Sequence, residues 1–386
     1  MQVKRNIPFG RPILGETEKR LAADVLNGTV LTHGPRCTEF EQRFAERIGA
    51  RHALTVSSCT TGLQLALMAI DLKPGDEVLV PAETHVATAH AVEHAGGRPV
   101  FVDVVKVTGN IDPVKAEAAV TPRTRAIMPV HYLGLPCDMD SLRVIADRQR
   151  LTIIEDCALA LGGDYRGRHP GTLGTAGVFS FYPAKHITTL EGGMVTTNDD
   201  AFAARLRNLR AFGYDKALGE RKVPGIYDVV ALGHNFRMSE VQAAVGLGQL
   251  EQLDGFLSAR RRNTEILLNS LGQIEGISTF PISQGEARSA CYCVNIVLAE
   301  NLPIDRNELI MQLNAKGVGT SVHYPVPVPL MRYYRDKYGY RSGEFPIAEW
   351  ISDRAISLPV GPHVSAEDAQ FIGDTVLQVI ADAPKT

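Results

Sequence analysis

The strongest constraint on the fold is an alternation of short apolar runs and helix-like segments through the first two thirds of the chain. Runs this short, bounded by turn residues, are typical of strands buried on both faces of a parallel sheet. We predict strands at 78–80, 99–102, 126–130, 151–154, 177–181 and 194–197. Between them we predict helices at 60–70 and 87–94 and after Asp112 and Asp138. The pattern predicts an α/β fold in which helices cover both faces of a mostly parallel sheet.

The last third of the chain has a different pattern. One long amphipathic helix is predicted from 240 to 268, ending near Gly272 and capped by Ser239. It is followed by a predicted strand at 291–298 and predicted helices at 305–316 and 366–380. We therefore predict a large domain over residues 1–250 and a smaller α+β domain over residues 251–386, with the long helix as the bridge.

Composition and charge exclude several classes of function. The 386 residues carry a net charge of −3, so no basic field indicates a nucleic-acid partner. No apolar stretch approaches the roughly 20 residues that span a bilayer, and the N-terminus lacks the apolar core of a secretory signal. The scattered cysteines are typical of reduced thiols in a cytoplasmic protein: Cys37, Cys59, Cys137, Cys157, Cys291 and Cys293.

A metal centre is not predicted. Cys291 and Cys293 alternate as in a strand, which would place both thiols on one face. No second Cys/His pair completes a site, so metal ligation there is a minor alternative.

Lys185 and Asp156 carry the clearest chemical signal. Lys185 lies in the segment 180–193, and Asp156 ends the apolar run 151–154 as the second residue of an acidic pair. A lysine amine forms a Schiff base with a carbonyl once its environment makes the free amine accessible. A carboxylate at the C-terminal end of a parallel strand points into the ligand crevice and can keep a pyridine nitrogen protonated. The pair predicts a site for pyridoxal phosphate.

Each member of the pair also has a simpler interpretation. Lys185 taken alone would be a surface lysine in a loop, and Asp156 taken alone would be a helix N-cap. Their occurrence together favours the cofactor site.

A phosphate site is predicted at the start of the helix 60–70. Ser58, Cys59 and Thr60 are small or hydroxylic, and free N–H groups at a helix N-terminus attract anions. Ser180 is a second candidate phosphate ligand. Plain N-capping by Ser58 or Thr60 is an equally good interpretation of this segment by itself.

Three more polar residues lie at predicted element ends. His85 follows the strand 78–80, and its flat ring could stack on a cofactor or lie in an ordinary loop. Asn235 and Arg237 precede the long helix without an obvious local partner. A contact with a ligand or with a second subunit would explain them.

Together these motifs resemble the DegT/DnrJ/StrS family of nucleotide-sugar aminotransferases, pyridoxal phosphate enzymes of fold type I. The resemblance covers nearly the whole chain and rests on the order and spacing of the motifs. They lie at 31–35, 56–60, 80–85, 129–131, 155–156, 180–193, 233–240, 323–325 and 357–359. It implies a large domain with a seven-stranded, mostly parallel sheet between helices and a smaller α+β C-terminal domain.

The resemblance also implies roles for individual residues. Lys185 would be the Schiff-base lysine and proton shuttle, Asp156 the partner of the pyridine nitrogen, and His85 the ring-stacking residue. Thr60 and Ser180 would bind the phosphate, assisted by backbone N–H groups near Cys59 and Thr60. Asn235 would reach the phosphate bound to the neighbouring subunit of a homodimer. Substrate contacts are implied for His323, Tyr324 and Arg237.

Three departures from the family pattern bear on these roles. Leu159 stands where Gln or His often contacts the cofactor ring oxygen, so that contact is missing or supplied elsewhere. Leu190 stands where glycine is frequent. The segment 327–329 is Pro-Val-Pro where many members carry a histidine near the sugar. The particular sugar is therefore not carried over from the family.

The implied activity is ping-pong transamination from L-glutamate to a nucleotide-linked 3-keto or 4-keto hexose, with pyridoxamine phosphate as the intermediate cofactor form. The products would be amino sugars for surface polysaccharide, lipopolysaccharide or antibiotics. One alternative is a sugar 3-dehydratase, but those family members carry histidine at the position of Lys185. The other is a regulatory homologue that keeps the fold without turnover.

Overall fold

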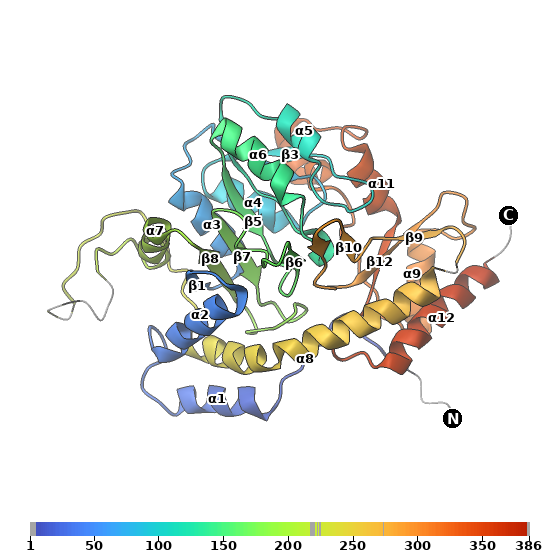
Figure 1. The fold of residues 1–386 in the computed structure, drawn as a ribbon, viewed down its shortest axis with the longest axis horizontal. Helices are drawn as coiled ribbons and strands as arrows, with labels where there is room; N and C mark the ends of the chain where they lie inside the picture. Colours follow the sequence, from blue (N-terminus) through green and yellow to red (C-terminus); the bar gives the residue numbers. More distant parts are fainter. Residues whose placement is uncertain (1–4, 217–220, 222, 224, 273, 384–386) are drawn as a thin grey trace.

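The structure is a computed structural model that describes residues 5–216, 221, 223, 225–272 and 274–383. Residues 1–4, on which part of the signal-peptide prediction rests, lie outside this set. A seven-stranded sheet forms the centre of the molecule (Figure 1). Its spatial order is β1 (His52–Val56), β8 (Gly193–Thr197), β7 (Ala176–Ser180), β5 (Thr152–Asp156), β4 (Thr124–Ile127), β2 (Glu77–Pro81) and β3 (Arg98–Val102).

The sheet confirms the mostly parallel arrangement. Strands β7, β5, β4, β2 and β3 pair in parallel. Only β8 runs against the others, because it pairs antiparallel with both β7 and β1. The carboxyl ends of the parallel strands therefore meet at one edge, where ligand sites form in open α/β sheets.

Helices cover both faces of the sheet, as the apolar runs predict. Alternate strand residues point to opposite faces, so Val78 and Val80 join one buried cluster while Leu79 joins another. The first face is covered by α3 (Cys59–Ala69), α4 (Val86–His94) and α7 (Asp200–Arg210). The opposite face is covered by α2 (Pro35–Ile48), α5 (Pro113–Ala118) and α6 (Met139–Gln149).

The long helix α8 (Glu240–Leu271) joins the two ends of the molecule (Figure 1). Ser239 caps it by accepting a hydrogen bond from the Gln242 N–H. Its first half packs on α1 (Glu16–Leu26) and α2, and its last turns pack on α12 (Ala366–Asp382). The predicted domain boundary at 250/251 falls inside this continuous helix, and the division into two domains stays a prediction.

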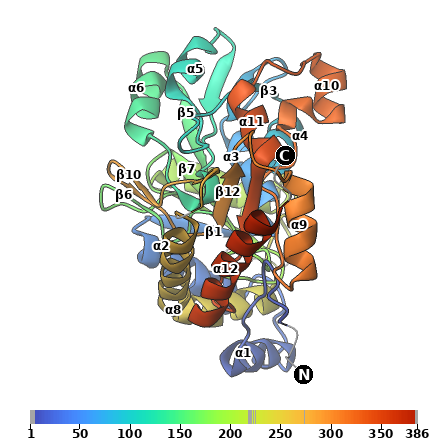
Figure 2. The ribbon, with the colours of Figure 1, turned by 90° about the vertical axis from the view of Figure 1, so that its right-hand side faces the viewer.

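The C-terminal part contains an antiparallel sheet in the order β13 (Ala355–Leu358), β12 (Val294–Leu298) and β9 (Ile277–Thr279). Helices α9 (Arg306–Ala315) and α12 contribute to the same buried cluster, and Figure 2 shows both beside β12. Two further helices, α10 (Arg332–Tyr338) and α11 (Pro346–Arg354), pack back toward β3 and α4 (Figure 2). A small sheet joins β10 (Ser283–Gln284), β11 (Ala287–Arg288) and β6 (Asp164–Tyr165), and single turns lie at η1 (Tyr132–Gly134) and η3 (Val328–Leu330).

One local prediction is wrong. The strand predicted at 291–298 begins only at Val294, because Cys291 has a φ of 53° and cannot continue an extended strand. The Cys291 thiol approaches the Ser289 carbonyl oxygen at 3.8 Å, whereas the Cys293 thiol approaches the Asn295 Oδ1 at 3.4 Å. The two thiols therefore have different surroundings. Among the described residues, no helix combines the length and apolar character needed to cross a bilayer.

Candidate active site

A cavity of about 260 Å³ lies where the carboxyl ends of β5 and β7 meet the N-terminus of α3. It brings together residues that are far apart in the sequence but were predicted to share one site. These are Ser58, Cys59, Thr60, His85, Asp156, Ser180, Lys185 and Tyr324.

Asp156 is the last residue of β5, and its carboxylate is held in place from two sides. Oδ2 accepts a hydrogen bond from the Thr88 hydroxyl at 2.8 Å, and Oδ1 accepts one from the Ala158 N–H at 3.1 Å. Thr88 belongs to α4 and also contacts the Thr84 hydroxyl at 2.8 Å. No helix starts at residues 157–162, so Asp156 is not a helix cap. Its carboxylate is a fixed, cavity-facing anion.

Lys185 lies in the connection between β7 and β8, with its amine in the cavity. Its main-chain oxygen accepts a hydrogen bond from the buried Arg260 guanidinium at 3.3 Å, and its Nζ lies 5.2 Å from the centre of the Tyr292 ring. Burial lowers the pKa of the Lys185 amine, and the Arg260 charge adds to this effect. The carboxylate of Asp156 opposes the shift. Lowering the pKa increases the fraction of free, nucleophilic amine.

The N-terminus of α3 forms one wall of the cavity. The Ser58 hydroxyl oxygen accepts a hydrogen bond from the Thr61 N–H at 3.2 Å, so Ser58 is the N-cap. Cys59 and Thr60 occupy the first turn, where N–H groups have no partner within the helix. Capping and anion binding therefore coexist in this segment, because Ser58 takes only the Thr61 N–H and leaves those of Cys59 and Thr60 available.

The strands β7 and β8 approach this helix terminus closely. Ser180 ends β7, and its hydroxyl oxygen accepts a hydrogen bond from the Tyr182 N–H at 3.4 Å. A Cβ on Gly193 would lie 2.7 Å from the Cys59 nitrogen, so only glycine permits this approach. N–H and hydroxyl groups from the start of α3 and the end of β7 therefore line the same cavity as Lys185.

His85 caps a helix and also lines the cavity. Its Nδ1 accepts a hydrogen bond from the Ala87 N–H at 3.2 Å, which makes His85 the N-cap of α4. Its ring lies edge-on to the Tyr324 ring, with 5.9 Å between centres. The cap fixes the ring at the cavity wall, where a flat ligand could stack on it.

Three predicted residues lie outside this cavity. Asn235 is exposed and forms a bridge to Ala211, and the Arg237 guanidinium lies 5.1 Å from the centre of the Phe212 ring beside a second hollow of about 570 Å³. His323 lies behind Tyr324, with its Nδ1 2.7 Å from the Ser357 hydroxyl. Burial, aided by the Lys185 charge, lowers the pKa of His323 to about 3.

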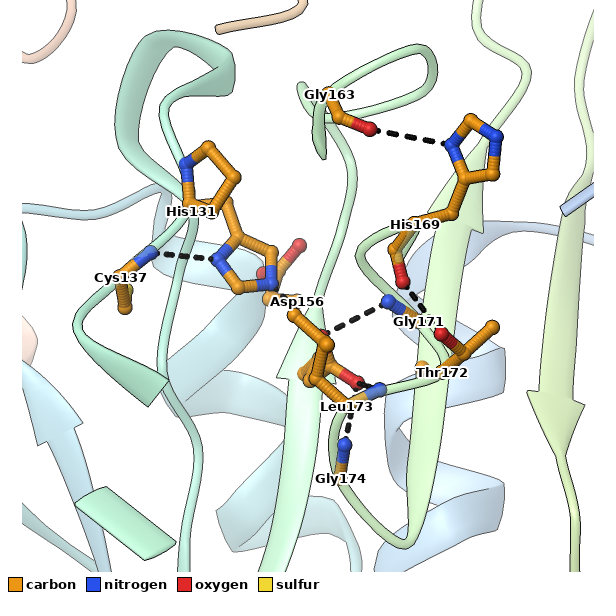
Figure 3. Close-up of polar contacts among 12 residues, drawn as sticks. His131, Cys137, Asp156, Gly163, His169, Gly171, Thr172, Leu173 and Gly174 are labelled. Carbon is orange, nitrogen blue, oxygen red and sulfur yellow. Dashed lines mark hydrogen bonds and ion pairs between the residues drawn. The ribbon is translucent and has the colours of Figure 1, made fainter. Parts of the chain in front are cut away.

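Among the described residues, one buried group has side chains close enough together to hold a metal ion: His131, Glu155 and Cys157. His131 accepts a hydrogen bond from the Cys137 N–H at Nδ1 (Figure 3). Its Nε2 lies 3.0 Å from the Glu155 carboxylate. The same carboxylate accepts hydrogen bonds from the N–H groups of the loop Gly171, Leu173 and Gly174. These atoms are occupied in a network that fixes the chain next to Asp156, which favours a structural role.

Comparison with known proteins identifies the family. The family model described as the DegT/DnrJ/EryC1/StrS aminotransferase family matches residues 12–377. This chain belongs to that family. It is therefore a pyridoxal-phosphate-dependent sugar aminotransferase of fold type I, and the resemblance noted from its motifs is confirmed.

Relatives within the family match over nearly their full lengths. The spore coat polysaccharide biosynthesis protein SpsC of Bacillus subtilis is 38% identical over 99% of this chain and 100% of its own. The Streptococcus pneumoniae protein Spr1654, solved in PLP and PMP forms, is 27% identical over 98% of this chain and 100% of its own in the PMP form, with a TM-score of 0.93. DesI, solved in the presence of its TDP-sugar product, is 33% identical over 98% of this chain and 94% of its own, with a TM-score of 0.88.

The cavity suits the family's cofactor. Pyridoxal phosphate needs an amine for its aldehyde, an anion for its pyridine nitrogen and donors for its phosphate. Lys185, Asp156 and the first turn of α3 offer these groups within one cavity. Leu159 also lines the cavity and offers only an apolar side chain, so no ring-oxygen contact comes from that position.

The other two departures from the family pattern are Leu190 and the segment 327–329. Leu190 has a φ of 71°, a conformation that glycine adopts without cost. In the Pro-Val-Pro segment 327–329, the Val328 N–H donates to the Ala82 oxygen at 3.0 Å, so this segment is packed against the end of β2.

Sequence analysis missed residues that hold the site together. Thr88 orients Asp156, Arg260 and Tyr292 support Lys185, and Glu83 contacts the Tyr324 main chain. Of these residues, Thr88 alone could have been noticed in the sequence, because it follows Thr84 by about one helical turn in the segment after β2.

Proposed function

We propose that this aminotransferase moves the amino group of L-glutamate to a nucleotide-linked 3-keto or 4-keto hexose by a ping-pong mechanism. The observation that carries the proposal is the meeting of Lys185 and Asp156 in one cavity, next to a helix N-terminus suited to phosphate. DesI supports a nucleotide-sugar acceptor through its TDP-sugar product. SpsC supports a role in polysaccharide biosynthesis, and lipopolysaccharide is one such product class.

The chemistry divides between the cofactor and the protein. Pyridoxal phosphate, when bound, supplies the electron sink that allows a carbon–hydrogen bond next to nitrogen to ionise. Lys185 first holds the cofactor and then, as a free amine of lowered pKa, accepts and returns the proton at that carbon. Asp156 keeps the pyridine nitrogen protonated, and Thr88 holds the carboxylate in position for this. The two half-reactions use the same groups, first with glutamate and then with the keto-sugar.

We further propose a homodimer with shared active sites. Asn235 is exposed and does not line the cavity of its own chain, which supports a contact with the cofactor phosphate of a partner. The segment around it exposes apolar side chains that a second copy would cover. They are Phe212, Val223, Ile226, Tyr227, Val229, Val230 and Leu232.

In this arrangement Arg237, His323 and Tyr324 are proposed to contact the nucleotide-sugar. Arg237 would approach it from the partner chain, and Tyr324 would approach it from the cavity wall.

The six free cysteines support the prediction of a reducing, cytoplasmic location.

Lys185 also provides the test of the proposal. Borohydride treatment of the purified, cofactor-loaded protein should attach the cofactor covalently to Lys185, as peptide mass spectrometry would detect. The substitution Lys185→Ala should abolish both this attachment and the absorbance change on adding glutamate, while Lys19→Ala on the exposed surface should leave both intact. Persistence of glutamate-dependent amination in the Lys185→Ala protein would overturn the mechanism.

The same experiment separates the alternatives. A regulatory homologue would bind the cofactor but give no absorbance change with glutamate. A 3-dehydratase would release water from the sugar without consuming glutamate, and the lysine at position 185 argues against it.

A further inference from the structure

Glu83 is a fully buried carboxyl group directly behind the cavity wall. Its Oε1 accepts a hydrogen bond from the Tyr324 N–H at 2.9 Å, and its Oε2 lies 2.8 Å from the Ser352 hydroxyl of α11. Among the described residues no lysine, arginine or histidine pairs with it. Burying a carboxyl group without a counter-charge is costly, so the position needs an explanation.

Glu83 begins a stretch of three residues that reach different parts of the cavity. Glu83 binds the main chain of Tyr324, whose ring lines the cavity. Thr84 contacts Thr88, the residue that orients Asp156. The next residue, His85, lines the cavity itself. A shift of this stretch would therefore move several walls of the site together.

We propose that Glu83 is a positioning residue for the cofactor cavity, joining the end of β2 to Tyr324 and to α11 so that the Tyr324 and His85 rings keep their arrangement. The inference rests on the proposed function, since it assumes that the cavity holds the cofactor. Glu83 touches neither the cofactor nor the substrate and acts only through its neighbours.

The protonation state of Glu83 fits this role. Burial raises the pKa of the Glu83 carboxyl to about 8, and the nearby Asp103 carboxylate contributes in the same direction. The other titratable group that faces it is the Tyr132 hydroxyl, 3.5 Å from Oε1, and the hydrogen bonds from the Tyr324 N–H and from the Ser352 and Tyr132 hydroxyls partly oppose the rise in pKa. Beyond Ser352, the Arg306 guanidinium binds the main-chain oxygen of that serine. At neutral pH Glu83 therefore keeps its proton and can both donate and accept.

This state has a consequence for stability. In the unfolded chain a glutamate titrates at about 4.3, whereas in the folded protein Glu83 titrates at about 8. Its contribution to stability is fully present below the unfolded pKa and is lost as the pH rises through the folded pKa. The wild-type protein should therefore lose stability between about pH 5 and pH 9 relative to Glu83→Gln, which has no proton to lose.

The experiment compares Glu83→Gln and Glu83→Ala with Asp103→Asn. Asp103 is a matched control, because its buried carboxylate accepts hydrogen bonds from the Ile347 and Ala348 N–H groups of α11 but lines no part of the cavity. The readouts are the equilibrium affinity of the apo-protein for pyridoxal phosphate and the Tm of the apo-protein from pH 5 to pH 9.

Glu83→Ala leaves the Tyr324 N–H unsatisfied, so we expect its affinity for pyridoxal phosphate to fall about tenfold. Glu83→Gln should bind as the wild type does, and its Tm should lack the alkaline decline. Asp103→Asn should lower Tm without changing affinity. Equal loss of affinity in Glu83→Ala and Asp103→Asn, or an unchanged alkaline decline in Glu83→Gln, would overturn the proposal. Failure of the proposed function would appear differently, as a wild-type protein that does not bind the cofactor or respond to glutamate.

Discussion

Two regions of this molecule carry predicted site residues. They differ in how far contacts within the chain hold those residues in place. Around Lys185 and Asp156, side chains are buried and fixed by hydrogen bonds from α4 and α8. Around Asn235 and Arg237, polar and apolar side chains are exposed beside a hollow of about 570 Å³. The first region is held in place by contacts within one chain, whereas the second exposes apolar side chains that the proposed partner would cover.

The largest effect is expected at Asp156, because the region around Lys185 and Asp156 carries the chemistry of the reaction. We expect Asp156→Ala to lower the rate of the glutamate half-reaction by about 10²–10³-fold, since a preorganised charge is removed from the cofactor's ring nitrogen. Single-turnover absorbance measurements would check this. Asp112→Ala, which removes the partly exposed N-cap of α5 far from Lys185 in the sequence, should lose stability only. An Asp156→Ala enzyme with a wild-type rate would remove Asp156 from the mechanism.

The exposed region is tested by complementation between chains. Asn235→Asp would bring a negative charge toward the partner's cofactor phosphate, and we expect about a 100-fold loss of activity, or roughly 2.7 kcal/mol. Mixed with the inactive Lys185→Ala protein under conditions of subunit exchange, it should regain activity, because one site of the mixed dimer has both native residues. Activity assays before and after exchange would measure this.

The control for this exchange is the doubly substituted chain, Lys185→Ala with Asn235→Asp, which offers no native Asn235 and should rescue nothing. No rescue by Lys185→Ala would show that Asn235 serves its own chain, and rescue by the double variant would show that the recovered activity does not need a partner's Asn235. The sharing of sites between subunits would then be wrong.

The two regions also show what sequence could predict. The strands and Asp156 were predictable because short apolar runs and the residues that end them are local patterns. Arg260 and Glu83 were not, since each gains its role from a partner far away in the chain, as Glu83 does from Tyr324. The role of Thr88 also depends on a distant residue, Asp156, and the sequence indicates it only through the spacing from Thr84. The strand predicted through Cys291 failed for a related reason: Cys291 has a positive φ just before β12, and the alternation of Cys, Tyr and Cys does not reveal it.

The smallest effect is expected at Leu190, on the border between the two regions. Its φ of 71° costs a side-chain-bearing residue about 1–2 kcal/mol, which glycine would avoid. Glycine would also increase the entropy of the unfolded chain, at about 0.4–1 kcal/mol, so the two effects nearly cancel. We expect Leu190→Gly to change the free energy of unfolding by about 1 kcal/mol or less, measured by urea denaturation of the apo-protein. Leu190 is half exposed, at 49%, although Thr188 and Thr189 directly before it are buried. If Leu190→Gly instead weakens subunit association in sedimentation experiments, the Leu190 side chain contributes to the subunit interface. Contacts with the partner would then offset the cost of its backbone conformation.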